Sequence, residues 1–599
     1  MLLFLLFATL LPCHHALAPT PTLGVVVDAS QPSGLRAVSL PRLPEAPLPL
    51  LAWAGFRDTI AHDGWSYLAV STNASHPDAL QAQAAGFVEG ALTHQRIWEY
   101  ASNHLSQYSW SEKLEDFIHT NDEWMKSQMD DPAAGQGAWW HQVSLVLDQQ
   151  AGLMSGYRAH APADHALSTK VLRTLSLHSD FDTLCELKGG CGPVGVAAVP
   201  PTAPNRIPDH CSVLVKLIAG NNDTTTTNTT TNNSSFPWSE LYVAHTTWSG
   251  FEDMTRIYKM YDFPFSVAGE GTGEGTDEGT GEGTDEGTGE EISVVPGRRL
   301  AFSSYPGNLF STDDWYTASS GLAVTETTID NHNVTLWSHV VPKGTVLTWI
   351  RTQVANRLSH DGPSWASNFA QYNSGTYNNE FHVVDYNVFQ QSRRVGRLLP
   401  HVLTVVDQMP GHVESADVTA SLADQGFWGS YNRPGLLPAY LRMNYTKVVE
   451  EYGDHYSHAR CSRAVLFRML HRNVTDEASL QRFMRFNRFN DPSLPENVTH
   501  QMCQDGPSAS NAISERGDLT KASSQCATDV ARQNEAGIDC KYTTAAMMED
   551  RHRLRTAAQS GPTYDDQPVF EWSTSPFASV PHVGQPDRWE FPWVAVGWD

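Results

Sequence analysis

The sequence carries little positive charge. Its 599 residues include 40 lysines and arginines against 66 aspartates and glutamates, which gives a formal net charge of −26. Nucleic-acid binding needs a concentrated basic surface, so this balance argues against a nucleic-acid partner. Part of the excess is local, because residues 269–291 form a Gly/Glu/Thr/Asp repeat with nine acidic and no basic side chains. Such a segment has almost nothing to bury, and we expect a disordered insertion there.

Long apolar runs are also scarce. No internal run approaches the roughly 18 apolar residues that cross a bilayer, so we predict no transmembrane segment. Residues 1–11 are apolar and Ala16-Leu17-Ala18 is a small-x-small cleavage site. We therefore predict a signal peptide over residues 1–18, although its start lacks the usual basic residues.

Nine sequons agree with passage through the secretory pathway, and we expect a lysosomal or extracellular protein. The glycosylation candidates are Asn73, Asn222, Asn228, Asn232, Asn233, Asn333, Asn444, Asn473 and Asn497.

Several common catalytic signatures are missing. There is no Gly-x-Ser-x-Gly elbow, which weakens an ordinary α/β-hydrolase lipase. There is no His-Glu-x-x-His and no Cys-x-x-Cys, so no strong zinc signature is present, and no P-loop or dinucleotide fingerprint occurs. We accordingly expect neither a metal nor an organic cofactor.

Cysteine is infrequent, with eight in the chain. Removal of Cys13 with the signal peptide leaves seven, an odd number, so at least one thiol is unpaired in a monomer. Cys185 and Cys191 flank the turn-prone Glu-Leu-Lys-Gly-Gly and are a candidate local disulfide. If Cys211 is the free thiol, the remaining six can pair in 15 ways that the sequence does not rank.

Two β-rich runs surround one of these cysteines. Residues 213–218 are typical of a buried strand and residues 241–244 form a second such run. Residues 221–235 between them are almost wholly Asn, Thr and Ser, which indicates an extended hairpin loop. Cys211 thus begins one strand and His245 ends the next. This arrangement suits a nucleophile at one edge of a sheet.

The same stretch resembles a known family. Cys-Ser-Val-Leu-Val-Lys-Leu at 211–217 and Val-Ala-His-Thr-Thr-Trp at 243–248 are similar to the nucleophile segment of the phospholipase B-like (lamina ancestor-like) family of N-terminal nucleophile hydrolases. Ser-Ser-Tyr-Pro-Gly at 303–307 and Asn-Ser-Gly-Thr-Tyr-Asn-Asn at 373–379 continue the match. It extends from about residue 80 to the end of the chain.

The resemblance implies an α+β fold, a four-layer αββα sandwich, in a precursor that cuts itself between His210 and Cys211. A leader fragment of residues 19–210 and a catalytic fragment of residues 211–599 would then stay associated without a covalent link. For the leader we expect a Pro-rich extended arm over 19–49, strands within 53–71 and a poorly ordered end at 191–208. The rest should be mostly helical, with helices in 79–105, 110–129 and 139–154.

A cysteine at a new N-terminus holds a nucleophile and a base in one residue. The α-amine has an ordinary pKa of about 7.7–8.0 and the thiol of about 8.5. The amine can take the thiol proton, the thiolate can attack an acyl carbonyl, and water can then hydrolyse the thioester.

Matching the family motifs residue by residue implies four partners. These are His245, Thr328, Asn432 and Arg463. Asn432 offers a neutral N–H donor for the oxyanion, and Arg463 can orient the reacting carboxamide or the substrate head group. His245 can steer protons or position Cys211, while Thr328 can hydrogen-bond the α-amine. Asn378 and Asn379 are reserve candidates, since that pair is equally a turn device.

One position departs from the family pattern. The family usually has His-Asn-Thr-Trp where this chain has Thr246 after His245. Two functions stay open. The first is an acyl hydrolase that acts on fatty-acyl esters of phospholipids or on amides. The second is a glycosylated binding protein on the same fold with little or no turnover.

Overall fold

The computed structural model of the chain is a mixed α/β structure. It describes residues 14–40, 49–104, 110–131, 137–189, 211–220, 236–268, 293–313, 315–523 and 525–598. Several predicted features lie outside these residues. They are His210, Cys191, the 191–208 end of the leader, the acidic repeat, and the sequons at Asn222, Asn228, Asn232 and Asn233.

Two large sheets, both mostly antiparallel, form the framework. In spatial order the seven-stranded sheet holds β1 (His14–Leu17), β20 (Val594–Gly597), β17 (Thr556–Ser560), β16 (Glu535–Thr544), β7 (Trp238–Gly250), β6 (Cys211–Ala219) and β15 (Phe427–Ser430). The eleven-stranded sheet holds β14 (His412–Asp417), β13 (Leu403–Met409), β12 (Asn379–Asp385), β11 (Leu322–Thr328), β10 (Trp315–Ala318), β9 (Arg299–Ser304), β8 (Ile257–Asp262), β5 (Ser66–Thr72), β4 (Ala52–Asp58), β2 (Leu23–Val27) and β3 (Leu35–Ser39).

Helices pack against the two sheets. The longer ones are α2 (Asp78–His104), α3 (Glu112–Met129), α4 (Ala138–His160), α5 (Thr169–Lys188), α6 (Thr348–Leu358), α7 (Gly362–Ala370), α8 (Tyr386–Val395), α12 (Ser462–Leu470) and α13 (Glu477–Met484). Shorter ones include α9 (Thr419–Gln425), α10 (Leu437–Arg442), α11 (Tyr445–Tyr452) and α14 (Glu496–Thr499).

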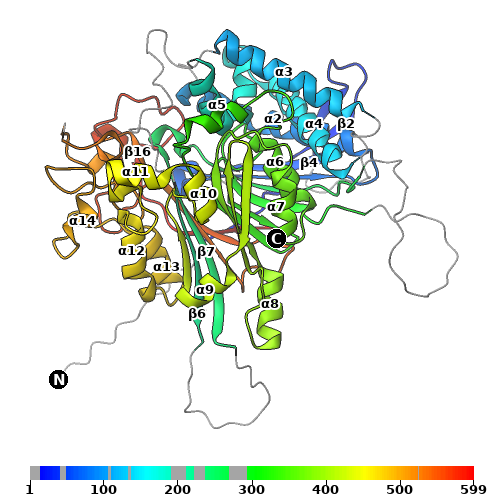
Figure 1. The fold of residues 1–599 in the computed structure, drawn as a ribbon. Helices are drawn as coiled ribbons and strands as arrows, with labels where there is room; N and C mark the ends of the chain where they lie inside the picture. The colour runs from blue at the N-terminus through cyan, green and yellow to red at the C-terminus, as the bar shows by residue number, and fades with distance from the viewer. Residues whose placement is uncertain are drawn as a thin grey trace, which may run out of the picture.

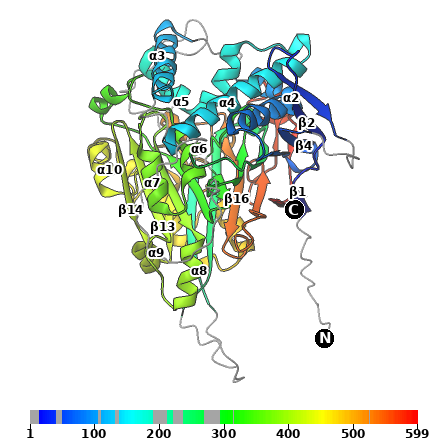
Figure 2. The ribbon, with the colours of Figure 1, turned by 90° about the vertical axis from the view of Figure 1, so that its right-hand side faces the viewer.

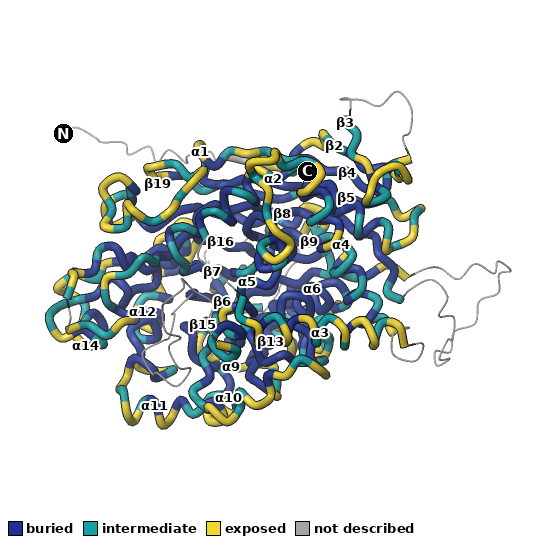
Figure 3. The backbone as a smooth tube through the Cα atoms, turned by 90° about the horizontal axis from the view of Figure 1, so that it is seen from above, coloured by how far each residue is buried: buried dark blue, intermediate teal, exposed yellow. Residues whose placement is uncertain are grey.

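The two sheets pack face to face. Val213 and Val243 of the seven-stranded sheet share a buried cluster with Tyr258 and Val405 of the eleven-stranded sheet. A second cluster joins α2, α4 and α7 to the outer face of the eleven-stranded sheet, and a third joins α12 and α13 to β6 and β7. The order is therefore helix, sheet, sheet, helix (Figures 1 and 2). Burial is deepest along the central strands, and exposed residues gather on helices such as α11 and α14 (Figure 3).

The leader does not form a separate domain. Its strands β2 to β5 extend the eleven-stranded sheet, and β5 pairs in parallel with β8 from Ser66↔Ile257 to Ser71↔Asp262. Its helices α2 to α5 lie together at one end of the molecule (Figure 1), where they share a buried cluster with α6. The predicted leader helices are confirmed, and α5 is an additional one. The extended arm over 19–49 is wrong in part, because β2 and β3 form there with Val25 and Leu35 in the core.

The six cysteines that remain when Cys13 and Cys211 are set aside do not all form disulfides. Cys503 bonds to Cys526, whereas Cys540 is a buried free thiol, as is Cys211. Cys540 lies on β16 among apolar side chains, where a thiol behaves as a small hydrophobe. Cys185 is disulfide-bonded, and its predicted partner Cys191 lies outside the described residues.

The predicted signal peptide and the glycosylation candidates differ in how far the structure exposes them. Strand β1, within the predicted signal peptide, pairs with β20 at the sheet edge. Asn473 and Asn497 are exposed. Asn73 and Asn333 instead use the amide nitrogen, the atom that would carry a glycan, in hydrogen bonds to main-chain carbonyls. Within the described part of the chain, no helix is both long and apolar enough to span a membrane.

Helices α2 and α4 touch at their backbones through glycines. A Cβ added to Gly86 would lie 1.9 Å from the Gln149 carbonyl oxygen, and one added to Gly152 would lie 2.0 Å from that of Gln83. Such distances are far inside van der Waals contact. Glycine destabilises a helix relative to alanine. Its presence at these positions is explained by the close contact of the two helices, which leaves no room for a Cβ atom.

Gly152→Ala should therefore destabilise the protein, although alanine is the better helix former by about 1 kcal/mol. Overpacking of this kind typically costs about 1–3 kcal/mol, and we expect a lower midpoint in thermal unfolding. Ser155→Ala, three residues further along α4, is the matched control and should shift the midpoint little. An unchanged or higher midpoint for Gly152→Ala would contradict the close contact.

A buried carboxyl group on β13 provides a second test. Burial, and then the charge of Glu380, raises the pKa of Asp407 well above its ordinary value. Above the ordinary pKa of about 3.9 the unfolded chain loses this proton while the folded chain keeps it, so stability falls as pH rises through that window. Asp407→Asn cannot ionise and still offers an oxygen to the Leu436 N–H.

We expect Asp407→Asn to be more stable than the native protein at pH 7, by roughly 1 kcal/mol or more, and similar to it near pH 4. Thermal midpoints at the two pH values measure this difference. Asp424→Asn, at an exposed position on α9, should show no such change with pH. Equal effects of Asp407→Asn at both pH values would rule out the raised pKa.

Candidate active site

Cys211 is the first residue of β6 and faces the interior between the two sheets. Side chains alternate along a strand, so it shares the face of Val213 and Val215, which belong to the cluster between the sheets. Thr247 lies directly opposite it on β7. The Cys211 side chain is covered in this continuous chain, with an exposed fraction of 3%.

The main-chain nitrogen of Cys211 is held by Asn432. It donates to Asn432 Oδ1 at 3.5 Å, a long hydrogen bond, while Asn432 Nδ2 donates to the Thr328 carbonyl oxygen at 2.7 Å. Asn432 has a left-handed backbone with φ of 64°, a conformation that asparagine tolerates better than most residues. Thr328 thus reaches Cys211 through Asn432.

The main-chain carbonyl of Cys211 is held by Arg463. Nη1 of this arginine donates to the Cys211 oxygen at 2.5 Å, and Nη2 donates to the Tyr431 oxygen at 3.0 Å. The guanidinium also stacks on Trp248, with 4.4 Å from its central carbon to the ring centroid. Arg463 therefore fixes the start of β6 against the turn that carries Asn432.

His245 lies on the same inner face and is fully buried. Its Nδ1 is 3.3 Å from Thr247 Oγ1, which accepts a hydrogen bond of 2.6 Å from Lys541 Nζ. Burial, and then the positive charge of Lys541, lowers the pKa of His245 well below its ordinary value. The imidazole is thus neutral and a weak base, which favours an orienting role over general-base catalysis.

Lys541 belongs to a buried network of two cations and two anions. Its Nζ lies 2.9 Å from Asp313 Oδ2 and 2.7 Å from Asp539 Oδ1, and Arg256 Nη1 lies 2.6 Å from Asp539 Oδ2. Arg256 also pairs with Asp313. Against the effect of burial, Arg256 and Lys541 lower the pKa of Asp313. Loss of any one partner would leave an uncompensated buried charge.

Charged groups act on the pKa of the Cys211 thiol in opposite directions. Burial, and then the negative charge of Glu326, raises the pKa of the Cys211 thiol well above its ordinary value. The Trp248 main-chain N–H and the Lys541 ammonium oppose that rise. In the continuous chain the thiol is therefore protonated at neutral pH.

The reserve candidates lie beside this region. With its amide nitrogen towards Glu326, Asn379 donates to Oε2 at 2.9 Å. Asn378 Nδ2 donates to the Gly375 carbonyl at 3.0 Å and so stabilises its own turn. Sequence reasoning missed Thr247 and Lys541. The hairpin register alone would have placed Thr247 opposite Cys211, but no local signal pointed to Lys541.

Among the residues that the structure describes, two groups of side chains have metal-ligating chemistry. Cys503 and Cys526 lie near Asp505, but their sulfurs are joined in the disulfide. The other group is His104, His178 and Asp253, where His104 Nδ1 lies 3.3 Å from Asp253 Oδ1 and its Nε2 lies 2.5 Å from His178 Nε2. These three side chains already form a hydrogen-bonded chain between the leader and the segment after β7.

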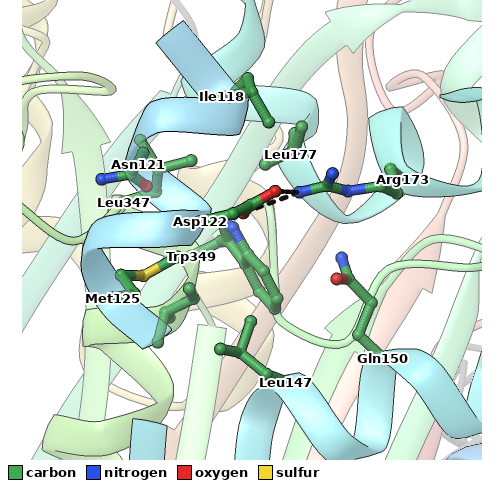
Figure 4. A pocket seen from close by; sticks show the side chains of 11 residues that line it. Ile118, Asn121, Asp122, Met125, Leu147, Gln150, Arg173, Leu177, Leu347 and Trp349 are labelled. Atoms are coloured by element: carbon green, nitrogen blue, oxygen red, sulfur yellow. Dashed lines mark hydrogen bonds and ion pairs between the residues drawn. The ribbon is translucent and has the colours of Figure 1, made fainter. Parts of the chain in front are cut away.

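A small hollow lies away from these residues, between α3, α4, α5 and the start of α6 (Figure 4). Its lining is mainly apolar, with the ion pair of Arg173 and Asp122 at 2.8 Å on one side. None of the predicted site residues lines it. We therefore assign it to packing between leader helices and α6.

Comparison with known proteins places these observations in a family. The family model for phospholipase B matches residues 52–596. A Rattus norvegicus protein provisionally named phospholipase B-like 2 is 38% identical over 563 residues, which cover 92% of this chain and 86% of the relative. Phospholipase B-like protein B of Dictyostelium discoideum is 31% identical over 566 residues, with 91% and 85% covered.

A third relative, from Caenorhabditis elegans and provisionally named phospholipase B-like 1, is 32% identical over 562 residues, with 92% of this chain and 87% of the relative covered. All three similarities span both the leader and the segments that carry Cys211, Asn432 and Arg463. The chain belongs to the phospholipase B family.

Proposed function

We propose that this protein is an N-terminal nucleophile hydrolase that cuts itself between His210 and Cys211 and then cleaves acyl bonds with Cys211. One observation carries the proposal. Side chains hold both main-chain groups of Cys211, the nitrogen by Asn432 and the carbonyl by Arg463. That arrangement suits a residue whose nitrogen becomes a free amine and takes part in the reaction. Family membership supports a hydrolase.

In the precursor the thiol of Cys211 would attack the carbonyl carbon of His210. The peptide bond becomes a thioester, and the freed nitrogen becomes the α-amine of Cys211. Water then hydrolyses the thioester and restores the thiol. The leader would stay in place after the cut, because β5 remains paired with β8 and the leader helices share their core with α6.

In the mature protein the α-amine takes the thiol proton, and the thiolate attacks the acyl carbonyl of the substrate. The amine returns the proton to the departing alcohol or amine, which leaves a thioester. The amine next removes a proton from water, whose oxygen attacks the thioester, and the thiol is restored as the carboxylic acid leaves. Asn432 would orient the amine, Arg463 would fix the strand, and the neutral His245 would support the nucleophile rather than act as its base.

The substrate class we propose is a lipid acyl ester or an amide, in the secretory pathway, in lysosomes or outside the cell. The names of the relatives support the lipid ester, while the free amine mechanism suits an amide equally. The disulfide between Cys503 and Cys526 is compatible with an oxidising compartment.

The alternative, a binding protein without turnover, draws its support from Thr246. Its hydroxyl donates to the Met484 carbonyl at 2.8 Å, on the opposite face of β7 from Cys211. A change at this position therefore alters the packing of α13 before it alters the chemistry of the thiol. This placement favours the hydrolase.

Sequencing the N-terminus of the large fragment tests the proposal. We expect it to begin Cys211-Ser212-Val213-Leu214, and Cys211→Ala should leave the chain uncut. Cys540→Ala removes another buried thiol and is the matched control, which should be cut normally. An intact native chain, or cuts only within residues 269–291, would rule out the self-cleaving mechanism.

Arg463→Met should slow self-cleavage at least about tenfold, because misplacement of a reacting group by an ångström can cost a hundredfold in rate. The fraction of cut chain in a pulse-chase experiment measures it. Arg468→Met, at an exposed position on the same helix, should be cut at the native rate. Equal rates for the two variants would show that Arg463 does not position Cys211.

A further inference from the structure

A directional chain of hydrogen bonds connects Asn432 to a buried carboxylate. The Asn432 main-chain N–H donates to Thr327 Oγ1 at 3.4 Å, Thr327 Oγ1 lies 2.6 Å from Ser430 Oγ, and Ser430 Oγ donates to Glu380 Oε2 at 2.7 Å. All four side chains have an exposed fraction of 0%. The hydrogen bonds that lead from Thr327, Ser430 and Glu380 to Cys211 pass through Asn432.

The chemistry of the groups fixes the direction of this chain. The Ser430 hydroxyl donates its single proton to Glu380 Oε2. The hydroxyl of Thr327 must then donate to Ser430, which leaves its lone pairs for the Asn432 N–H. Every member has one arrangement that satisfies it, and such a network is rigid.

Glu380 is itself firmly held. Its Oε1 accepts from Trp428 Nε1 at 3.2 Å and faces His382 Nε2 at 3.0 Å. Asp407 lies opposite it on β13, and burial, and then the charge of Glu380, raises the pKa of the Asp407 carboxyl. A Cβ on Gly435 would lie 2.4 Å from Oε1, so the turn after Asn432 also closes on this carboxylate.

The last member of this series of hydrogen bonds, Asn432, contacts the main-chain nitrogen of Cys211. The backbone of Asn432 is held by Thr327. Its Nδ2 donates to the Thr328 carbonyl, and its Oδ1 accepts from the Cys211 nitrogen. The network also crosses between sheets, because Ser430 belongs to β15 while Thr327 and Glu380 belong to β11 and β12. It thereby ties the edge strand beside β6 to the opposite sheet.

We propose that Glu380, Ser430 and Thr327 are positioning residues that aim Asn432 Oδ1 at the α-amine of Cys211. This inference rests on the proposed function, since the amine exists only after the cut before Cys211. Loss of a link lets the Asn432 turn relax, and the amine then loses its fixed place beside the thiol. An ammonium held beside a thiol favours the thiolate, so the reactivity of Cys211 at acidic pH depends on this chain.

The test compares single-hydroxyl variants of the full, mature protein. The initial rate at which methyl methanethiosulfonate modifies Cys211 is followed from pH 5 to 8 by mass spectrometry of the peptide that begins at this residue. We expect Thr327→Val to react about threefold to tenfold more slowly near pH 6, and Thr327→Ser, which restores the hydroxyl, to stay within about twofold of native. Ser430→Ala should match Thr327→Val and provides a second break if Thr327→Val does not fold.

Thr325→Val is the matched control. Thr325 lies two residues earlier on the same face of β11, is fully buried, and its Oγ1 has no hydrogen-bond partner among the described residues. Its pH profile should equal the native one.

The proposal is overturned if Thr327→Val and Ser430→Ala react like the native protein, if Thr325→Val slows equally, or if Thr327→Ser fails to restore the rate. N-terminal sequencing of the same samples separates the two levels. A native chain that does not begin at Cys211 overturns the proposed function and this role with it. A correctly cut chain with an unchanged profile overturns the positioning role alone.

Discussion

The parallel pairing of β5 with β8 is the contact on which the rest of the structure depends. It joins four strands of the leader to seven strands of the remaining chain in one sheet. The opposite sheet packs on that surface, and its strands β6, β7 and β16 carry Cys211, His245 and Lys541. The leader therefore forms part of the sheet that supports the site. It is also the segment that the proposed cut would separate from Cys211.

Much of the fold was accessible from the sequence, and the reasons are local. Residues 79–105 and 139–154 have helical periodicity, and the β-rich runs on either side of the Asn/Thr loop form the β6–β7 hairpin. Residues 19–49 misled because proline content suggested an arm. Val25 and Leu35 become core residues only when α2 covers them, which is a tertiary effect. Cysteine parity likewise gave no warning that Cys540 would be buried as a thiol.

The candidate site could likewise be predicted only in part from the sequence. Family resemblance brought Cys211, Thr328, Asn432 and Arg463 together, and hydrogen bonds in the structure link all four. The sequence did not predict that Lys541 and Glu380 lie near the site. Their neighbours come from strands that are distant in the chain, and no residue spacing indicates these contacts. Arg463 also shows that a residue type does not fix a role. Its Nη1 and Nη2 atoms donate to the main-chain carbonyls of Cys211 and Tyr431, so the guanidinium holds the protein backbone.

The position of Cys211 at the first residue of β6 would anchor the new N-terminus that the proposed cut creates. The ladder with β7 begins at Cys211 itself, opposite Thr247. The backbone of this residue is therefore ordered by the sheet, and its place does not depend on the residues before it. A free amine at this position would lose little conformational entropy when a substrate binds, because the strand has already fixed it.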